Sequence, residues 1–160
     1  MPRQNPFMQA YRTPYEIPPF DLITYADYLP AVKEGIAQQR REIEAIVNNT
    51  EKPTFENTIL AYDMSGELLE RAMLVFMAMD DAMSTPELAQ IAGEVYSLTS
   101  QWSDEVSMNP RLFERVKYLY DNRNRMSLTA TQSRAIESSY KNFTRNGALL
   151  SADDQKSLSE

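Results

Sequence analysis

The stretch from residue 85 to residue 106 reads TPELAQIAGEVYSLTSQWSDEV and has the start signals and the periodicity of a helix. Thr85 has a side-chain oxygen that can cap a helix start, Pro86 suits the first helical position, and Glu87 adds negative charge to the first turn. Apolar residues then recur at the helical period, at Leu88, Ile91, Val95, Leu98, Trp102 and Val106. The stretch therefore predicts a long amphipathic helix.

Similar signals on both sides of this stretch predict further helices. One is expected from about residue 26 to residue 47, and a second long helix from an N-cap at Thr54 to about residue 79. A short helix should follow Asn109-Pro110, and the capping box from Thr129 to Gln132 should open another that stops at Asn146-Gly147. Because no alternating strand pattern lies between them, the sequence predicts an all-α fold, an antiparallel helical bundle of about five main helices.

Residues 1–23 differ from the rest of the chain. They hold five of the nine prolines, which predicts an extended, non-helical arm, and they also carry four large aromatic rings, at Phe7, Tyr11, Tyr15 and Phe20. Such rings are costly to leave in water, so the arm is expected to pack on the helical body formed by residues 24–160. A floppy tail with incidental aromatics is the alternative.

The end of the chain contains another helix start, Ser151-Ala152-Asp153-Asp154, but the sequence stops at Glu160. A helix that short is marginal unless it is packed. We therefore expect the 24–160 body to be truncated before a further domain of a longer chain.

Composition excludes several classes of function. The chain has no Cys and no His, which excludes thiol catalysis and every Ser-His or His-zinc arrangement within it. The net charge of −7 argues against nucleic-acid binding, and no apolar run is long enough for a membrane span. No signal peptide pattern opens the sequence, so we expect a cytoplasmic protein. A periplasmic protein whose signal peptide has been removed is the alternative.

Paired carboxylates are the only candidates for chemistry, and each has a simpler explanation. The pairs are Glu42 with Glu44, Glu67 with Glu70, Asp80 with Asp81, and Asp153 with Asp154. Arg40, Arg41 and Arg71 lie near enough in sequence for ordinary surface pairing, so a solvated helical face is expected. We therefore predict no catalytic, cofactor-binding or metal-binding residue in this chain.

Five methionines, Met64, Met73, Met77, Met79 and Met83, cluster in the second long helix. They do not share one stripe, so at least one faces away from the local core. Gap filling in a helix buried on several sides is one explanation, and contact with a further domain is the other.

An ordered series of motifs resembles the opening of the thimet-oligopeptidase-like zinc metallopeptidases, the family of bacterial oligopeptidase A and peptidyl-dipeptidase Dcp. The series covers nearly the whole chain. It comprises residues 5–7, 18–23, 28–36, 53–59, 65–71, 75–76, 109–117 and 128–148. Residues 53–59, Pro-Thr-Phe-Glu-Asn-Thr-Ile, are the most specific piece. Ala26-Asp27 departs from the Glu-His that relatives often have before the aromatic residue of this region.

The resemblance implies an N-terminal helical domain that forms part of the wall of a deep channel admitting short peptides. In the family, zinc is bound by a His-Glu-x-x-His helix far downstream, where the Glu activates water. None of those residues is present here, so the resemblance implies no catalytic or zinc-binding residue in this chain and places both in the parent's catalytic domain.

Residues 53–59 and 140–148 lean toward the peptidyl-dipeptidases, which release C-terminal dipeptides, with the oligopeptidases second. A free-standing acidic helical interaction module is the alternative from a different class. If part of the surface normally packs on the catalytic domain, the isolated chain is expected to self-associate.

Overall fold

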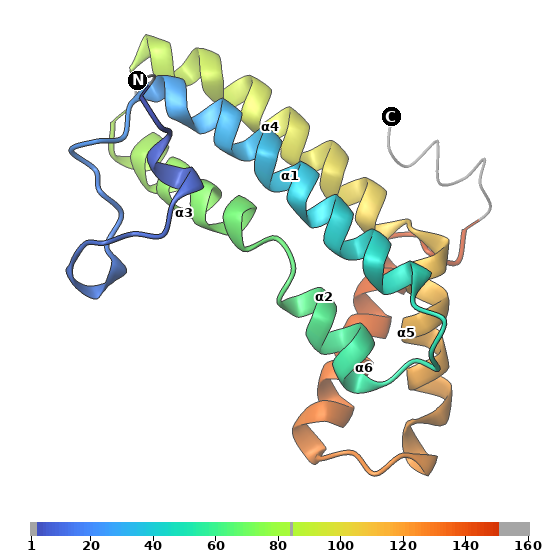
Figure 1. Ribbon diagram of the computed structural model, residues 1–160. Helices are drawn as coiled ribbons and strands as arrows, with labels where there is room; N and C mark the ends of the chain where they lie inside the picture. Colours follow the sequence, from blue (N-terminus) through green and yellow to red (C-terminus); the bar gives the residue numbers. More distant parts are fainter. Residues whose placement is uncertain (1–2, 84, 151–160) are drawn as a thin grey trace. The chain divides into compact units, whose positions relative to one another are not determined.

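The computed structural model describes residues 3–83 and 85–150, and all regular structure in that part is helical (Figure 1). The predicted all-α fold of about five main helices is therefore confirmed. No helix of the described part has the length and apolar character needed to cross a membrane. The chain divides into two compact units, which are described one at a time below: residues 1–40 with 66–100, and residues 41–65 with 101–160. The helix start predicted at Ser151 lies outside the described residues.

The first predicted helix is α1, Tyr25–Asn48. The backbone N–H of Thr24 donates to the Asp27 carboxylate at 2.7 Å, which is the reach-back half of a capping box. Pro30 is the sixth residue of the helix. Proline is best tolerated in the first turn of a helix, and the missing N–H of Pro30 falls just beyond that turn.

The prediction of one long helix from Thr54 to about residue 79 is wrong. The segment forms three pieces: a π-helical turn η3 (Phe55–Leu60), a short α2 (Ala61–Asp63) and α3 (Glu67–Ala82). Gly66 causes the last break, because it adopts a left-handed conformation with φ of 79°. Thr54 does cap the start, since its side chain accepts from Asn57 N while the Asn57 side chain accepts from Thr54 N.

The remaining predicted helix starts are confirmed. In α4 (Pro86–Ser107) the Leu88 N–H donates to Thr85 Oγ1 at 3.2 Å. In α5 (Pro110–Asn122) Asn109 Oδ1 accepts from the N–H groups of Arg111 and Leu112 at 3.1 Å.

The last helix also begins and ends where the sequence predicts. The capping box of Thr129 and Gln132 opens α6 (Ala130–Arg145), and Gly147 follows its end with φ of 90°. These caps satisfy backbone groups that the ends of a helix otherwise leave without partners.

The core of the first unit is built from α3 and the parts of α1 and α4 that lie in it. Its buried members are Phe7, Tyr28, Ala31, Val32, Leu68, Ala72, Val75, Phe76, Leu88, Ala92 and Val95. At Gly35 the backbones of α1 and α3 approach closely, because a Cβ built there would lie 2.7 Å from the Cα of Leu69. Phe7 comes from the 3₁₀ turn η1 (Pro6–Met8). A second 3₁₀ turn in the arm, η2, spans Pro14–Glu16.

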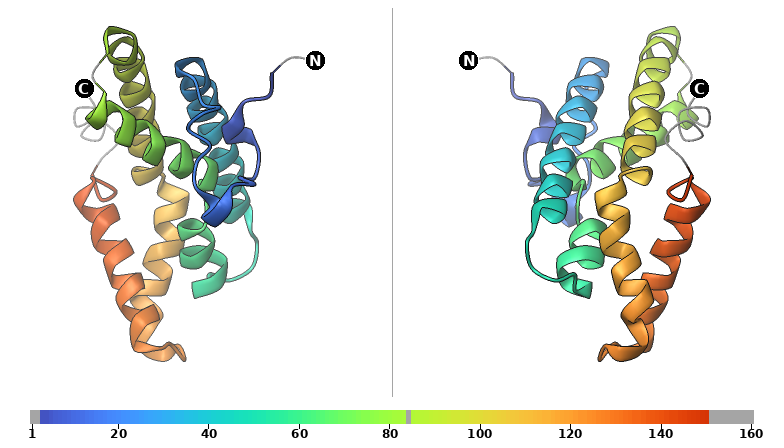
Figure 2. Two further views of the ribbon diagram at one scale, coloured as in Figure 1. Left: turned by 90° about the vertical axis from the view of Figure 1, so that its left-hand side faces the viewer. Right: turned by 90° about the vertical axis from the view of Figure 1, so that its right-hand side faces the viewer.

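In the second unit α5 and α6 lie side by side and antiparallel, joined by the 3₁₀ turn η4 (Arg123–Arg125) and a short loop (Figure 2). Tyr120 and Tyr140 stack across the pair with ring centroids 3.9 Å apart. Phe113 stacks on Tyr140 at 5.8 Å and contacts the buried Phe143. The two helices are thus joined by a continuous row of aromatic rings.

Candidate functional site

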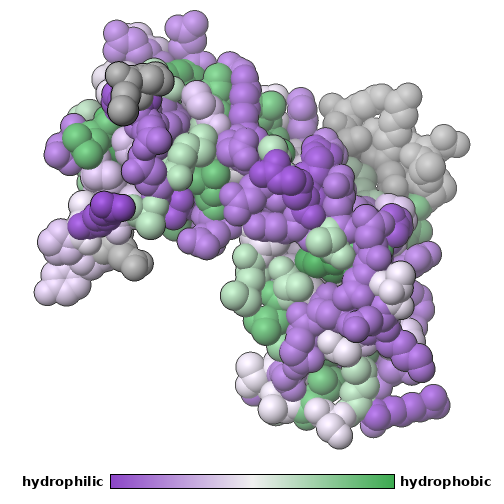
Figure 3. Space-filling view, viewed as in Figure 1, coloured by the Kyte–Doolittle hydropathy of each residue, from purple (hydrophilic) through white to green (hydrophobic). Residues whose placement is uncertain are grey.

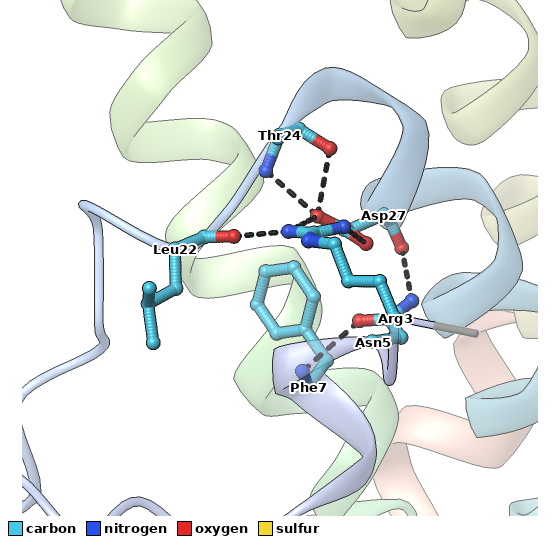
Figure 4. Close-up of polar contacts among 6 residues, drawn as sticks. All are labelled: Arg3, Asn5, Phe7, Leu22, Thr24 and Asp27. Atoms are coloured by element: carbon cyan, nitrogen blue, oxygen red, sulfur yellow. Dashed lines mark hydrogen bonds and ion pairs between the residues drawn. The ribbon is translucent and has the colours of Figure 1, made fainter. Parts of the chain in front are cut away.

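The first candidate site is the junction between the N-terminal arm and the start of α1, where Asp27 is the central residue (Figure 4). The guanidinium of Arg3 donates to both carboxylate oxygens of Asp27 at 2.8 Å. The hydroxyl and backbone N–H of Thr24 donate to the same carboxylate at 2.8 and 2.7 Å. Arg3 also donates to the carbonyl of Leu22, and Asn5 donates to the carbonyl of Asp27 at 2.8 Å. The arm is therefore held to the helix by both side-chain and backbone partners.

This arrangement holds Asp27 ionised. Burial of the carboxyl raises its pKa, but the hydrogen bond from Arg3 and the two from Thr24 outweigh burial, so the pKa lies below its usual value of 3.8. The side chain of Asp27 is only 5% exposed, whereas that of Arg3 is 51% exposed. A bidentate arginine contact to a nearly buried carboxylate gives a directional link. The departure at Ala26-Asp27 that the sequence left without a role thus supplies the carboxylate of this junction.

Phe7 is the apolar anchor of the arm. Its side chain is fully buried, and its ring lies 5.5 Å from that of Tyr28, which in turn meets Phe76 edge-on at 5.3 Å. The side chain of Asn5 accepts from the Phe7 N–H at 3.0 Å and fixes the turn that directs the ring inward. Three segments distant in sequence thus share one aromatic cluster.

Arg71 of α3 forms a second polar link to the arm. It donates to the carbonyl of Phe7 at 2.6 Å, and its guanidinium carbon lies 5.0 Å from the centre of the Tyr11 ring. Burial raises the pKa of Tyr11, and the charge of Arg71 opposes that effect. The Tyr11 hydroxyl and the Nε of Arg71 are buried without a hydrogen-bond partner.

A groove of about 390 Å³ lies beside this link, between the arm and α3. Its lining is Ala10, Tyr11, Pro18, Glu67, Glu70, Arg71, Leu74 and Val75. The Leu74 side chain is 63% exposed. The Oε1 atom of Glu67 lies 3.7 Å from Nη1 of Arg71. With an apolar side chain, a phenol, a guanidinium and two carboxylates, the groove has the chemistry to bind a mixed polar and apolar group.

The predicted carboxylate pairs are dispersed on helix surfaces. Glu44 and Glu70 are exposed, and Glu67 forms the expected surface pair with Arg71. Asp80 accepts a hydrogen bond from the Tyr96 hydroxyl at 2.8 Å, and Asp81 is exposed. Asp153 and Asp154 lie outside the described residues. Within residues 3–83 and 85–150 no three acidic side chains gather as they would around a metal ion.

The predicted methionine cluster is spread over several environments. Met73 and Met79 pack partly against the core of the first unit, while Met77 and Met83 of the same region are about half exposed. Met64 follows α2 and is 72% exposed.

On the face shown in Figure 3, hydrophilic residues cover most of the surface and hydrophobic ones occupy separate smaller areas.

The second unit contains a polar centre that sequence reasoning missed, formed by Arg115. This residue is 8% exposed, and its Nη1 donates to the carbonyls of Asn49 and Glu51 at 2.9 and 3.4 Å. Its Nη2 donates to Asn57 Oδ1 at 2.9 Å and its Nε to Thr58 Oγ1 at 3.2 Å. Burial lowers the pKa of Arg115, and the charge of Glu51 opposes that shift.

Arg115 thus joins the loop before η3 and the π-helical turn itself to α5. Such turns are often retained at functional positions. The signal in the sequence is the spacing of Arg115, which lies three residues after Leu112 and four before Leu119 and so falls on the apolar face of the helix.

Comparison with known proteins shows similarity along nearly the whole chain. No protein-family model matches it. The chain is 36% identical over 158 residues, 99% of its length, to the dipeptidyl carboxypeptidase of Escherichia coli, and 36% identical over 154 residues to that of Salmonella typhimurium. It is 24% identical over 148 residues to oligopeptidase A of Escherichia coli.

The chain spans only 23% of the length of the two dipeptidyl carboxypeptidases and 22% of oligopeptidase A. The resemblance read from the motif series is confirmed: this helical chain is homologous to a part, about a quarter, of the bacterial peptidases dipeptidyl carboxypeptidase and oligopeptidase A.

Proposed function

We propose that this chain is the non-catalytic N-terminal helical domain of a zinc-dependent peptidase that cleaves short peptides. In this proposal residues 1–23 form the arm of the domain and residues 24–160 its helical body. The observation that carries it is the similarity of the chain, over 99% of its length, to less than a quarter of a dipeptidyl carboxypeptidase. The remaining three quarters of such a protein would hold the catalytic groups.

Release of C-terminal dipeptides is favoured over internal cleavage. Identity is 36% to the dipeptidyl carboxypeptidase and 24% to oligopeptidase A of the same organism. The residues that set specificity would lie outside this chain, so the preference rests on this difference in similarity.

The zinc of the proposed parent does not fit any residues of this chain. The sequence has no His and no Cys, which are the usual zinc ligands together with carboxylates. The zinc ligands and the water-activating Glu would therefore come from the catalytic domain of the same polypeptide, the proposed partner of this one.

The role left for the described residues is mechanical: they form part of the wall of a channel that admits short, unfolded peptides. The arm supports this role, because Arg3, Phe7 and Arg71 tie it to α1 and α3 by two polar links and one buried ring. A wall must keep its shape while peptides enter. Membranes and nucleic acids are not among the proposed partners.

A free-standing acidic helical interaction module is the second candidate. It is favoured by the buried core of the first unit and by the exposed apolar side chains of Leu74 and Met77. Under either candidate the isolated chain would self-associate through such side chains. Under either candidate the protein would also reside in the cytoplasm, unless a signal peptide precedes the chain in its precursor.

An assay of the 160-residue chain beside its full-length parent tests the proposal. Each protein is incubated with zinc and a short peptide, and released dipeptides are measured by mass spectrometry. The chain should release nothing, while the parent should release C-terminal dipeptides and stop when a chelator is added. A parent that cleaves nothing, or a chain that cleaves by itself, would refute the proposal.

A further inference from the structure

The acidic chain contains a basic segment that its net charge conceals. Residues 110–145, which form the α5–α6 pair, contain eight basic residues and three acidic ones, a local charge of +5 in a chain of charge −7. The basic residues are Arg111, Arg115, Lys117, Arg123, Arg125, Arg134, Lys141 and Arg145. Charge counted over the whole chain therefore misrepresents this part of the surface.

Three of these cations lie on one exposed face of α6. Arg134, Ser138, Lys141 and Arg145, here called the cationic stripe, are spaced at i, i+4, i+7 and i+11, and all four are exposed. Such spacing returns to the same side of a helix, so the three charges follow one line. At about 1.5 Å of rise per residue, Lys141 lies roughly 10.5 Å along the axis from Arg134 and roughly 6 Å from Arg145.

Within the described residues no ion pair joins a carboxylate to Arg134, Lys141 or Arg145. The one acidic residue in the α6 sequence, Glu137, is paired with Arg123 at 3.4 Å. Arg134 donates to the carbonyl of Ala130 in its own helix, at 3.3 Å. Lys117 of α5, by contrast, has an acidic partner in Asp121. The stripe thus differs from an ordinary mixed-charge helix surface.

The opposite face of α6 holds the stripe in place. Ile136 and Phe143 are buried, and Tyr140 stacks between Tyr120 and Phe113. The capping box at Thr129 fixes the start of the helix. A charged row on a rigid support loses little conformational freedom on binding, apart from that of the side chains themselves.

We propose that the cationic stripe binds an acidic polypeptide segment. Carboxylates on alternate residues of an extended chain are about 6.8 Å apart, close to the roughly 6 Å step between Lys141 and Arg145. The next carboxylate on the same face of the extended chain is about 13.6 Å away, so the long side chains of Arg134 and Lys141 must span the difference from their roughly 10.5 Å step. Arginine can hold each carboxylate with two parallel hydrogen bonds. This inference does not rest on the proposed peptidase function.

A polypeptide fits this surface better than a nucleic acid. Nucleic-acid affinity grows with the number of phosphates neutralised, and three cations on a chain of charge −7 neutralise few. At about 0.1 M ionic strength the Debye length is about 10 Å, so the acidic residues far from α6 scarcely oppose a partner bound along the stripe.

The test is a titration of the ¹⁵N-labelled 160-residue chain with decaglutamate, followed by NMR at about 0.1 M ionic strength. Decaglutamine is the neutral control peptide. Shifts should concentrate in residues 130–145 with decaglutamate, be absent with decaglutamine and disappear near 1 M salt. The variant Arg134→Gln/Lys141→Gln/Arg145→Gln should bind about tenfold more weakly, since three exposed ion pairs are lost.

A matched variant separates the stripe from net charge. Arg12→Gln/Lys33→Gln/Lys52→Gln removes three exposed cations elsewhere and should bind decaglutamate as the unaltered chain does. Equal weakening in both variants would overturn the proposal, as would shifts spread over other helices. Tighter binding of single-stranded DNA than of decaglutamate would assign the stripe to a nucleic acid instead. Circular dichroism confirms that each variant retains its helices.

Discussion

Asp27 shows how much of the arm depends on one residue. Its carboxylate accepts from Arg3 and from two groups of Thr24, although Arg3 is 24 positions away in sequence. The pattern of prolines predicts an extended arm but not the partner of a particular aspartate, because ion pairs between distant residues leave no periodic signal. The sequence therefore indicates where the arm lies in the chain and leaves its attachment undetermined.

The depressed pKa of Asp27 predicts an acid-sensitive contribution to stability. Because the pKa is lower in the folded chain than its usual 3.8, the contribution is fully present above pH 3.8 and is lost as the pH falls through the folded value. Asp27→Asn should destabilise the chain most near neutral pH. Urea unfolding of both proteins from pH 7 to pH 2 should show the two stabilities converging in acid.

The control is Asp21→Asn, which alters an exposed carboxylate of the same arm. It should leave the pH dependence almost unchanged. A constant difference between Asp27→Asn and the unaltered chain at every pH would contradict the role assigned to the ionised carboxylate.

Helix starts are the elements that the sequence predicts best. Thr54, Thr85, Asn109 and Thr129 all act as caps, because a cap is local chemistry between residues two or three apart. The pattern does not predict the interruption of the second long helix, since an isolated glycine such as Gly66 is tolerated within a helix at a cost of about 1 kcal/mol. The Gln39 side chain lies so close to Gly66 that a Cβ there would be 2.5 Å from it, and this closeness is visible only in the fold.

The close approach of α1 and α3 at Gly35 predicts opposite effects for two glycine substitutions. A Cβ at Gly35 would lie 2.7 to 2.9 Å from Leu69, whereas one at Gly93 of α4 meets no atom within 4 Å. Gly35→Ala should cost about 1–3 kcal/mol through overpacking. Gly93→Ala should stabilise the chain by about 0.5–1 kcal/mol, because alanine is the better helix former.

Urea midpoints of the two alanine variants, measured side by side, decide this point. The account requires a lower midpoint for Gly35→Ala and a higher one for Gly93→Ala. A higher midpoint for both would mean that α1 and α3 are not in close contact at Gly35.

At the scale of the whole molecule, local patterns predict the all-α fold and the motif series predicts the family. What they miss has a common physical origin. The Arg115 centre joins residues more than 55 positions apart, and the cationic stripe appears only when charge is counted by helix face instead of by chain. Long-range partners and local charge thus need the fold.

The central claim is that this chain is one domain of a longer peptidase, and the intact mass of the natural protein tests it most directly. An antibody raised against the 160-residue chain is used to isolate the protein from its own cells for mass spectrometry. Because the chain spans 23% of its relatives, the protein should have about four times the mass of the 18.4 kDa chain. A natural protein of about 18 kDa would contradict the claim.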